Sequence, residues 1–444
     1  MRGRRKTSKL QFLRTLIALG VFACLTLATQ GTGTAQSNDG NASTETASAR
    51  AGHLRVFDEV WENIRARYYD PSLRGVDWDA LRAKFRPGAE AARTQGELYT
   101  VLRRMIARLH DPHTRVFAPG ESFDWRSPRF IAVGVSVREL GGELIVTKVE
   151  EDSEAARAGV RAGDSVLGVD GEPVTAIISR RMEEQAAEAP ATARFLAVAK
   201  LFDGPRDSFV TVTFRGVGAR ERSVRLRREI HARTPVLKVR RAAGGVGVVW
   251  FNIFTPEIAA QFVRALRSEL KDTHSLVVDL RDNGGGEAEA MADIASVFLP
   301  PGKSLGLFTD RAGRVRLEPH TRTTLLSTAD APSNFRGPVV VLTGARTASA
   351  SEVFVAALKE AGRASVVGER SCGCVLGIRR RHMLPDGGIL DISEMDYRTA
   401  RGARLEGAGL EPDEQITPTR RDLQTGRDAA MERAVEILRM KNRK

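Results

Sequence analysis

Residues 338–362 place small hydroxyl side chains where a buried strand passes into a helix. They read PVVVLTGARTASASEVFVAALKEAG, and Ser349 and Ser351 fall in the first turn of the expected helix. A serine at such a junction lies at the carboxyl edge of a sheet, and the next amide, that of Ala350, points into the same space with the helix dipole behind it. The pattern suits a nucleophilic serine beside an oxyanion donor. On this stretch alone, capping of the helix by the hydroxyls is the simpler interpretation.

A glycine-rich turn supplies the second element of the expected site. In VVDLRDNGGGEAEA, three glycines separate a strand from a helix. Backbone amides can approach a ligand closely there, so Gly285 or Gly286 could supply a second oxyanion donor. Phosphate binding is disfavoured, because the turn has neither a Walker lysine nor dinucleotide spacing and carries acidic residues.

Four motifs in order resemble those of the carboxy-terminal processing peptidases and their tricorn and retinoid-binding-protein relatives. They are DLRDNGGG, TASASE, VVGE and EGAGLEPDE, and the similarity extends from about residue 53 to the end. The resemblance implies a serine-type peptidase with Ser349 as nucleophile and the amides of Ala350 and Gly285 as oxyanion hole. In the processing peptidases a lysine 25 residues beyond the serine is the general base, but here that position is Cys374. The glutamine that usually supports the lysine is replaced by Ile378.

The proton acceptor for this serine must therefore be another group. Arg379 and Arg380 cannot serve, because a guanidinium stays protonated at working pH. In the tricorn-like branch a histidine from the helical region is the base and a glutamate near the carboxyl end supports the site. The resemblance places these roles on His113, in DPHT, and on Glu406, in RLEGAGLEPD. Two other interpretations stay open: His113 as a turn histidine that hydrogen-bonds its own loop, and Glu406 as an anchor of its loop to the sheet.

The first 35 residues have the order of a secretory signal. A basic start is followed by an apolar stretch of 14 residues and a small, polar end, with cleavage expected after Ala35. A membrane anchor is the alternative, but a span needs ~20 apolar residues. The segment therefore predicts a periplasmic or secreted protein, attached to a membrane only if the signal stays uncleaved.

Two cysteines, Cys372 and Cys374, remain after removal of this signal. In an oxidising compartment a disulfide between them is the simplest expectation, and free thiols are the alternative. Metal binding is disfavoured, because two ligands do not make a tetrahedral site and no nearby Cys/His pair completes it. We expect no metal and no cofactor.

The charge of the chain argues against nucleic-acid binding. Lys and Arg number 68 against 55 Asp and Glu, a formal net charge of +13. Residues 1–35 hold six basic and no acidic side chains, so 13 − 6 leaves +7 in the mature chain. The remaining basic residues are spread among acids and form no stripe with aromatic residues, which favours an ordinary solvated surface.

The periodicity of the sequence predicts an α+β multidomain protein. Apolar residues recur at helical spacing after residue 53, at strand spacing after residue 129, and in alternating strands and helices after residue 233. The expected order is a signal peptide (1–35), a linker (36–52), an N-terminal helical cap (53–128), a PDZ-like β domain (129–229) and an α/β peptidase core with a C-terminal helix (230–444). The resemblance implies a core of the ClpP/crotonase type.

Residues 129–229 resemble a PDZ domain, mainly through AVGVSV and EAARAGVRAGDSVLGVDGEPV. The resemblance implies a peptide-binding loop at Ala132, Val133, Gly134 and Val135, which would capture a terminal carboxylate while the peptide adds as a strand. A PDZ-like domain that serves only as a lid is the alternative.

Together these features predict an exported serine-type endopeptidase. It would cleave proteins or peptides, engage their C-terminal ends and use a base other than lysine. A non-catalytic protein of the same fold that binds peptides or apolar ligands is the alternative. The sequence does not define an oligomeric state.

Overall fold

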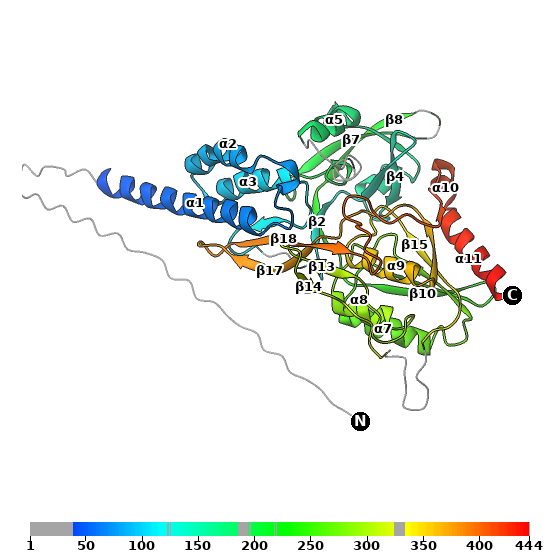
Figure 1. Ribbon diagram of the computed structural model, residues 1–444. Coiled ribbons are helices and arrows are strands. Elements are labelled where there is room, and N and C mark those ends of the chain that lie inside the picture. The colour runs from blue at the N-terminus through cyan, green and yellow to red at the C-terminus, as the bar shows by residue number, and fades with distance from the viewer. Residues whose placement is uncertain are drawn as a thin grey trace, which may run out of the picture. The chain divides into compact units, whose positions relative to one another are not determined.

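The computed structural model describes residues 39–443, with gaps at 122, 123, 125, 185–193, 195–196, 217, 219 and 324–333 (Figure 1). Side chains are described from residue 48 onward. The predicted signal peptide lies outside these residues. Within them, no helix combines the length and the apolar character that crossing a membrane requires. The protein is a mixed helix and sheet structure with several hydrophobic cores.

Three helices form the N-terminal part of the described chain. They are α1 (Asp39–Arg67), α2 (Trp78–Ala91) and α3 (Gln95–Ile106), with short 3₁₀ turns at Leu73–Gly75 and Ala107–Leu109. The side chains of Asp77 and Thr94 cap α2 and α3 by accepting hydrogen bonds from amides of the first helical turn. The helices share a core with strand β18 (Ile389–Arg398), which ties this region to the C-terminal half of the chain.

Two helices of this region extend further than their local sequence suggests. Helix α1 begins at Asp39, so the predicted linker is helical from that residue on. The linker contains Ala, Glu and Ser, which a helix tolerates, so α1 can extend through it although the buried apolar face of α1 begins only at Val56. Helix α2 runs to Ala91 through Pro87, although a proline in a helix interior usually kinks or ends the helix. A Cβ added at Gly88 would lie 3.4 Å from the Val101 side chain of α3, so packing between the two helices continues past the proline.

A second region contains five strands paired in one continuous order, together with two helices, α4 and α5. Its elements are β2 (Arg129–Ala132), β3 (Val135–Leu140), β4 (Glu143–Val149), α4 (Glu154–Arg157), β5 (Ser165–Val169), β6 (Glu172–Pro173), α5 (Val174–Glu184), β7 (Phe209–Arg215), β8 (Glu221–Arg227) and β9 (Glu229–Ala232). The strand order is β3-β4-β5-β7-β8, with β6 beside β5. Strand β3 therefore lies at an edge of this sheet. Strands β7 and β8 form an antiparallel hairpin at the end of this region.

The C-terminal region is built on a largely parallel sheet. Its strands are β10 (Leu237–Ala242), β11 (Val246–Phe251), β12 (Ser275–Asp279), β15 (Val339–Thr343), β16 (Ala364–Gly368) and β19 (Glu414–Gln415), paired in this order. Only the β10–β11 pair is antiparallel. The helices are α7 (Pro256–Arg267), α8 (Ala288–Ala295), α9 (Ala350–Glu360), α10 (Arg420–Thr425) and α11 (Ala429–Asn442).

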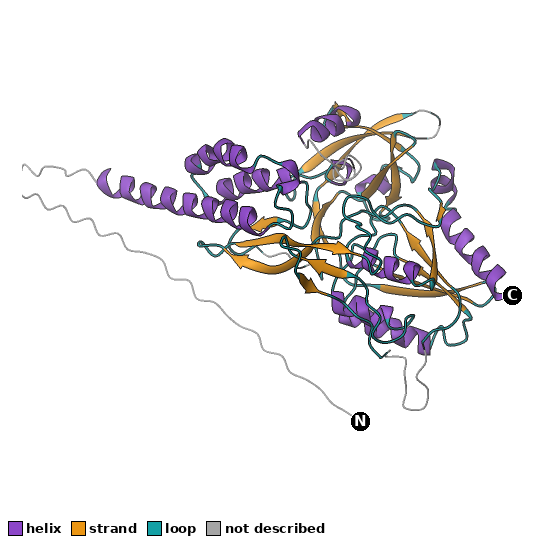
Figure 2. Cartoon of the chain, viewed as in Figure 1, coloured by secondary structure: helices purple, strands orange, loops and turns teal. Residues whose placement is uncertain are grey.

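Helices cover both faces of this sheet, because successive strand residues point to opposite sides (Figure 2). Val249, Val278 and Val341 belong to the core shared with α7, α8 and α9. Val248, Val277 and Val340 belong to the core shared with α11. The strands are thus buried on both faces, as continuous apolar runs predict for parallel sheets.

A further sheet, which the sequence did not indicate, joins the N-terminal helices to this core. It contains β1 (Arg115–Phe117), β13 (Leu307–Thr309), β14 (Val315–Leu317), β17 (Gly377–Met383) and β18 in the order β1-β18-β13-β14, with β17 also paired to β18. Strand β17 is mostly Arg and His, so its sequence does not show the alternation of apolar and polar residues by which a strand is recognised.

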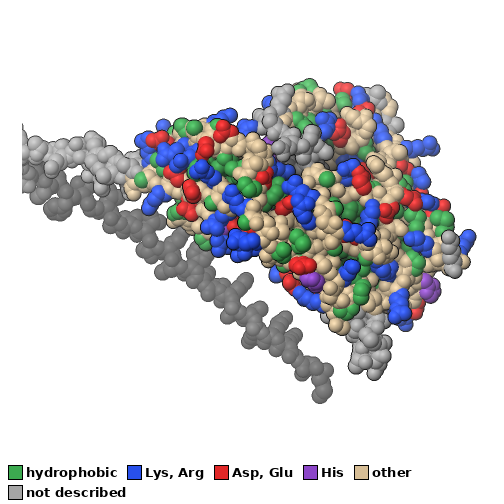
Figure 3. All heavy atoms as spheres, in the orientation of Figure 1, with side chains coloured by type: hydrophobic (Ala, Val, Ile, Leu, Met, Phe, Trp, Pro, Cys, Tyr) green, Lys and Arg blue, Asp and Glu red, His purple; other side chains and the backbone are tan. Residues whose placement is uncertain are grey.

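The surface carries charges of both signs. On the face shown in Figure 3, basic and acidic side chains are intermixed over the whole surface. Within the described residues, no group of three or more His, Cys, Asp or Glu side chains could hold a metal ion.

Candidate active site

Ser349 lies at the N-terminal end of α9, directly after the loop that follows β15. Its backbone has φ 56° and ψ −124°, a conformation that residues other than glycine rarely adopt. Such strain costs of order 1–3 kcal/mol and persists where the surrounding structure imposes it, often at functional sites. The side chain is half-buried. Ser349 therefore stands at the junction that the sequence predicted and is not sealed in the core.

The neighbouring hydroxyl of Ser351 has a structural role. It is fully buried and donates to the carbonyl oxygen of Asn283 at 3.1 Å and to the Asn283 Oδ1 at 2.8 Å. Ser351 thus binds α9 to the glycine-rich turn after β12. Because its hydroxyl is committed to this contact, Ser349 is the better candidate for a nucleophile.

The two expected oxyanion donors differ in their availability. Ala350 is the first residue of α9, and no hydrogen bond to its amide is found in the described chain. The Gly285 amide donates to Asn283 Oδ1 at 2.9 Å. Gly285 is nevertheless at the site, since a Cβ there would lie 2.7 Å from the Ser349 Cβ and 3.0 Å from the Ala350 nitrogen. In this structure the Ala350 amide is available to a ligand, whereas the Gly285 amide is already hydrogen-bonded and its backbone packs against Ser349.

A methyl group at Gly285 should therefore be poorly tolerated. The residue has φ +103°, and Gly285→Ala is expected to lower the free energy of unfolding by about 2 kcal/mol. Urea unfolding of Gly284→Ala provides the control, because a Cβ at Gly284 meets nothing within 4 Å. Equal losses in the two variants would contradict the close packing of Gly285 on Ser349.

Glu352 is a buried carboxylate beneath the site. Its Oε2 accepts hydrogen bonds from the Ser349 amide at 3.1 Å and the Cys374 amide at 3.0 Å. Its Oε1 accepts from the Gly373 amide at 2.8 Å and from the Ser371 hydroxyl. Burial raises the pKa of Glu352 to about 7, against the opposing effect of these hydrogen bonds. Glu352 thus holds the first residue of α9 and the turn at residues 371–374 in one arrangement.

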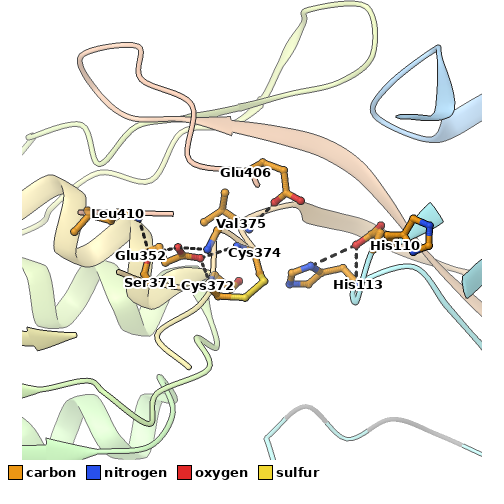
Figure 4. Close-up of a disulfide and its surroundings, with 12 residues drawn as sticks. His110, His113, Glu352, Ser371, Cys372, Cys374, Val375, Glu406 and Leu410 are labelled. Carbon is orange, nitrogen blue, oxygen red and sulfur yellow. Dashed lines mark hydrogen bonds and ion pairs between the residues drawn. A yellow bond between two sulfur atoms is a disulfide. The ribbon is translucent and has the colours of Figure 1, made fainter. Parts of the chain in front are cut away.

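A disulfide joins Cys372 and Cys374 within this turn (Figure 4). The Cys374 carbonyl oxygen accepts from the Ser349 amide at 2.9 Å, so the turn is bonded directly to the candidate nucleophile. Cys374 is buried, with 5% of its surface exposed. The turn that carries the disulfide is therefore bonded to the backbone of Ser349.

The structure pairs His113 with Asp111. The His113 Nδ1 lies 3.7 Å from Asp111 Oδ1, and the His113 amide donates to the same oxygen at 2.8 Å. Burial alone would raise the pKa of Asp111, but the hydrogen bonds and the charge of His113 outweigh it and lower the pKa to about 2. Figure 4 shows the imidazole of His113 pointing toward the disulfide and that of His110 pointing away. Within the described residues, the buried Nδ1 of His113 has no hydrogen-bond partner.

Glu406 contacts the disulfide turn rather than the imidazole. Its Oε2 accepts from the Val375 amide at 2.9 Å, and its Oε1 lies 3.6 Å from the Arg74 guanidinium. Burial raises the pKa of Glu406, against the Val375 amide and the charges of Arg74 and His113. The expected His113–Glu406 contact is therefore absent from the described contacts, and these bonds fit the anchoring role that was left open.

Sequence reasoning missed several residues of this site: Arg74, Asp111, Asn283 and Glu352. Asp111 and Asn283 were within the quoted motifs DPHT and DNGGG, two residues from His113 and Gly285. Glu352 closes TASASE, where an acidic residue at the third helical position is the ordinary partner of a capping serine. Arg74 has no local signal, because only the fold brings it to Glu406.

The expected peptide-binding loop connects β2 to β3. It turns at Gly134, which has φ +75° and whose Cβ position would be 2.3 Å from the Ser153 Cβ. Ala132 ends β2, Val133 is buried in the core of this region, and Val135 begins the edge strand β3. The loop thus stands at the end of an edge strand, as peptide addition requires.

Comparison with known proteins identifies the class to which this fold and site belong. Three family models match the chain. The model for Peptidase family S41 matches residues 245–416, the model for the Tricorn protease C1 domain matches residues 50–107, and the model for the PDZ domain matches residues 145–189. These matches define a serine peptidase with a PDZ domain.

Individual relatives extend the match over most of the chain. Carboxyl-terminal-processing peptidase 1, chloroplastic, of Arabidopsis thaliana is 29% identical over 377 residues, 82% of this chain and 72% of that protein. The probable CtpA-like serine protease of Staphylococcus aureus is 29% identical over 324 residues, 70% of this chain and 58% of that protein. The solved photosystem II D1 C-terminal processing protease has a TM-score of 0.54 and 26% identity, covering 82% of this chain and 93% of that one. These similarities support a CtpA-like, carboxy-terminal processing family with a PDZ domain and confirm the resemblance.

Proposed function

We propose that the protein is an exported serine endopeptidase that forms an acyl-enzyme on Ser349. The observation that carries this proposal is the left-handed backbone of Ser349 at the start of α9, with the open Ala350 amide beside it. The substrates are proteins or peptides. Export rests on the signal-like first 35 residues.

We assign the proton-accepting role to His113, with Asp111 as its orienting carboxylate. Asp111 Oδ1 lies 3.7 Å from Nδ1, which has no hydrogen-bond partner in the described chain, and we assign the proton-accepting role to Nε2. A base held by a carboxylate is the usual way to activate a serine hydroxyl. No lysine is needed, which fits the presence of Cys374 at that position. Glu406 acts through the turn it anchors, as a positioning residue.

The proposed reaction has two halves. As Ser349 Oγ bonds to the substrate carbonyl carbon, its proton passes to the base, and the carbonyl oxygen becomes an oxyanion that accepts from the Ala350 amide. The base then returns the proton to the departing amine as the C–N bond breaks. A water molecule repeats the sequence on the ester and releases Ser349.

The PDZ-like region would bring the C-terminal end of the substrate to this site. Its loop at residues 132–135 and the edge strand β3 suit capture of a carboxylate and strand addition. Arg138 of β3 donates to Glu369 Oε2 at 2.8 Å, and Glu369 precedes Cys372 by three residues. The strand that would receive the peptide is thus bonded close to the catalytic turn.

A serine-reactive fluorophosphonate probe tests the proposal. The mature protein should be labelled, peptide mapping should place the label on Ser349, and His113→Ala should slow labelling by about 10²-fold. His110→Asn is the matched control and should react at the wild-type rate, because His110 points away from the disulfide and asparagine tolerates its left-handed backbone (φ 50°). Absence of labelling in a protein that still binds C-terminal peptides would favour a non-catalytic binding protein.

A further inference from the structure

The disulfide turn adjoins two candidate catalytic residues. Ser349 is bonded to it through the Cys374 carbonyl oxygen at 2.9 Å, and the His113 imidazole points toward its sulfur atoms (Figure 4). A disulfide can neither give nor take a proton. In this state the neighbour shared by Ser349 and His113 cannot pass a proton between them.

The backbone of this turn is held without the help of the disulfide. Each of the five amides from Ser371 to Val375 donates a hydrogen bond. The Ser371 amide donates to the Leu410 oxygen at 3.1 Å and the Cys372 amide to the Thr347 oxygen at 2.9 Å. The Gly373 and Cys374 amides donate to the two Glu352 oxygens at 2.8 and 3.0 Å, and the Val375 amide donates to Glu406 Oε2 at 2.9 Å. The Gly373 oxygen also accepts from the Gly407 amide at 2.8 Å. Reduction should therefore change the chemistry of the two side chains and leave the turn in place.

The two sulfur atoms differ in access. Cys372 is half-buried, whereas Cys374 is 5% exposed. An external thiolate would therefore attack Cys372, and Cys374 would leave as a thiolate into the site. The second thiol of a dithiol then displaces Cys372 and forms its own disulfide. Two electrons pass from the dithiol to the protein, and two protein thiols result.

We propose that the Cys372–Cys374 disulfide is a thiol-exchange site that controls the reactivity of Ser349. In the disulfide form Ser349 reacts slowly. Reduction by a dithiol gives the Cys374 thiol, in the turn that is bonded to Ser349 and that the His113 imidazole points toward. This thiol gives its proton to the imidazole and, as a thiolate, accepts the proton of the Ser349 hydroxyl. The inference rests on the proposed role of Ser349 and adds regulation by thiol exchange to it.

The test measures fluorophosphonate labelling of Ser349, mapped by mass spectrometry, before and after treatment of the mature protein with dithiothreitol. Alkylation of both cysteines and unchanged circular dichroism establish reduction without unfolding. We expect reduction to raise the labelling rate by about 10²-fold, the usual contribution of a positioned proton acceptor. Cys372→Ser keeps the Cys374 thiol and should be fast without reductant, whereas Cys374→Ser should be slow with and without it.

Other outcomes overturn the proposal in distinguishable ways. Equal labelling of the wild type in both states refutes control by the disulfide and leaves the peptidase function standing. Rapid labelling of both cysteine variants refutes the role of Cys374 and assigns the effect to loosening of the turn. Absence of labelling in every form and both states refutes the proposed function together with this inference.

Discussion

Replacement of Ser349 by alanine is expected to lower peptide hydrolysis by at least about 10⁴-fold, because the proposed acyl-enzyme forms on the hydroxyl that this change removes. The hydroxyl contributes little to packing, since it is half-buried at the end of α9. The variant should therefore fold and should bind C-terminal peptides as the wild type does. The measurement is kcat/KM on a peptide with a free carboxyl end, together with peptide affinity.

Ser351→Ala is the matched comparison, two residues along the same helix. Its hydroxyl donates to Asn283 in the core, so the variant should lose about 1–2 kcal/mol of unfolding free energy and retain much of its activity when folded. The opposite result, an active Ser349→Ala and an inactive but folded Ser351→Ala, would move the nucleophile to Ser351 and overturn the assignment.

The parts of the site that follow from local sequence pattern could be predicted. The strand, loop and helix around Ser349 form a contiguous pattern, and the turn with Gly285 follows the neighbouring parallel strand β12. Because the carboxyl ends of adjacent parallel strands share one edge, the two motifs had to meet. The contact of Gly285 with Ser349 is the physical result.

The partners of polar side chains could not be predicted in the same way. His113 was given Glu406 as its carboxylate, but the chain bends after the left-handed residue His110 and brings Asp111 back onto His113. Glu406 instead meets Arg74, which lies 332 positions earlier in the chain. Such pairings between polar side chains depend on the backbone conformation of two loops, and the spacing of residues in the sequence does not determine that conformation.

The hairpin β17–β18 and the start of α1 were missed for a related reason. Strand β17 and the start of α1 are mostly polar, so neither shows the apolar periodicity that predicts a strand or a helix. Their structure depends on the segments beside them. Strand β17 forms because β18 is buried against the N-terminal helices, and β17 then pairs with it. Tertiary contacts decide the structure there, and local propensity does not.

The second large effect is expected from the buried carboxyl group of Glu352. Its pKa in the folded protein is about 7, above the ordinary value of 4.5 for a glutamate side chain, because burial disfavours the charged form. Between these values the folded state holds the proton more tightly than the unfolded state, so stability is greatest below about pH 4.5 and falls as the pH rises to about 7. The expected loss attributable to Glu352 is about 3 kcal/mol.

The difference between wild type and Glu352→Gln isolates this effect, because glutamine does not ionise. As the pH rises from about 4.5 to 7, the free energy of unfolding of the variant should gain about 3 kcal/mol relative to the wild type, measured by urea unfolding at each pH. Glu360→Gln, on the same helix, controls for loss of a carboxylate from α9. Parallel pH curves for the wild type and Glu352→Gln would contradict the argument. They would mean that the carboxyl group joining Ser349 to the disulfide turn ionises as easily in the fold as in the unfolded chain, and that its hydrogen bonds balance the cost of its burial.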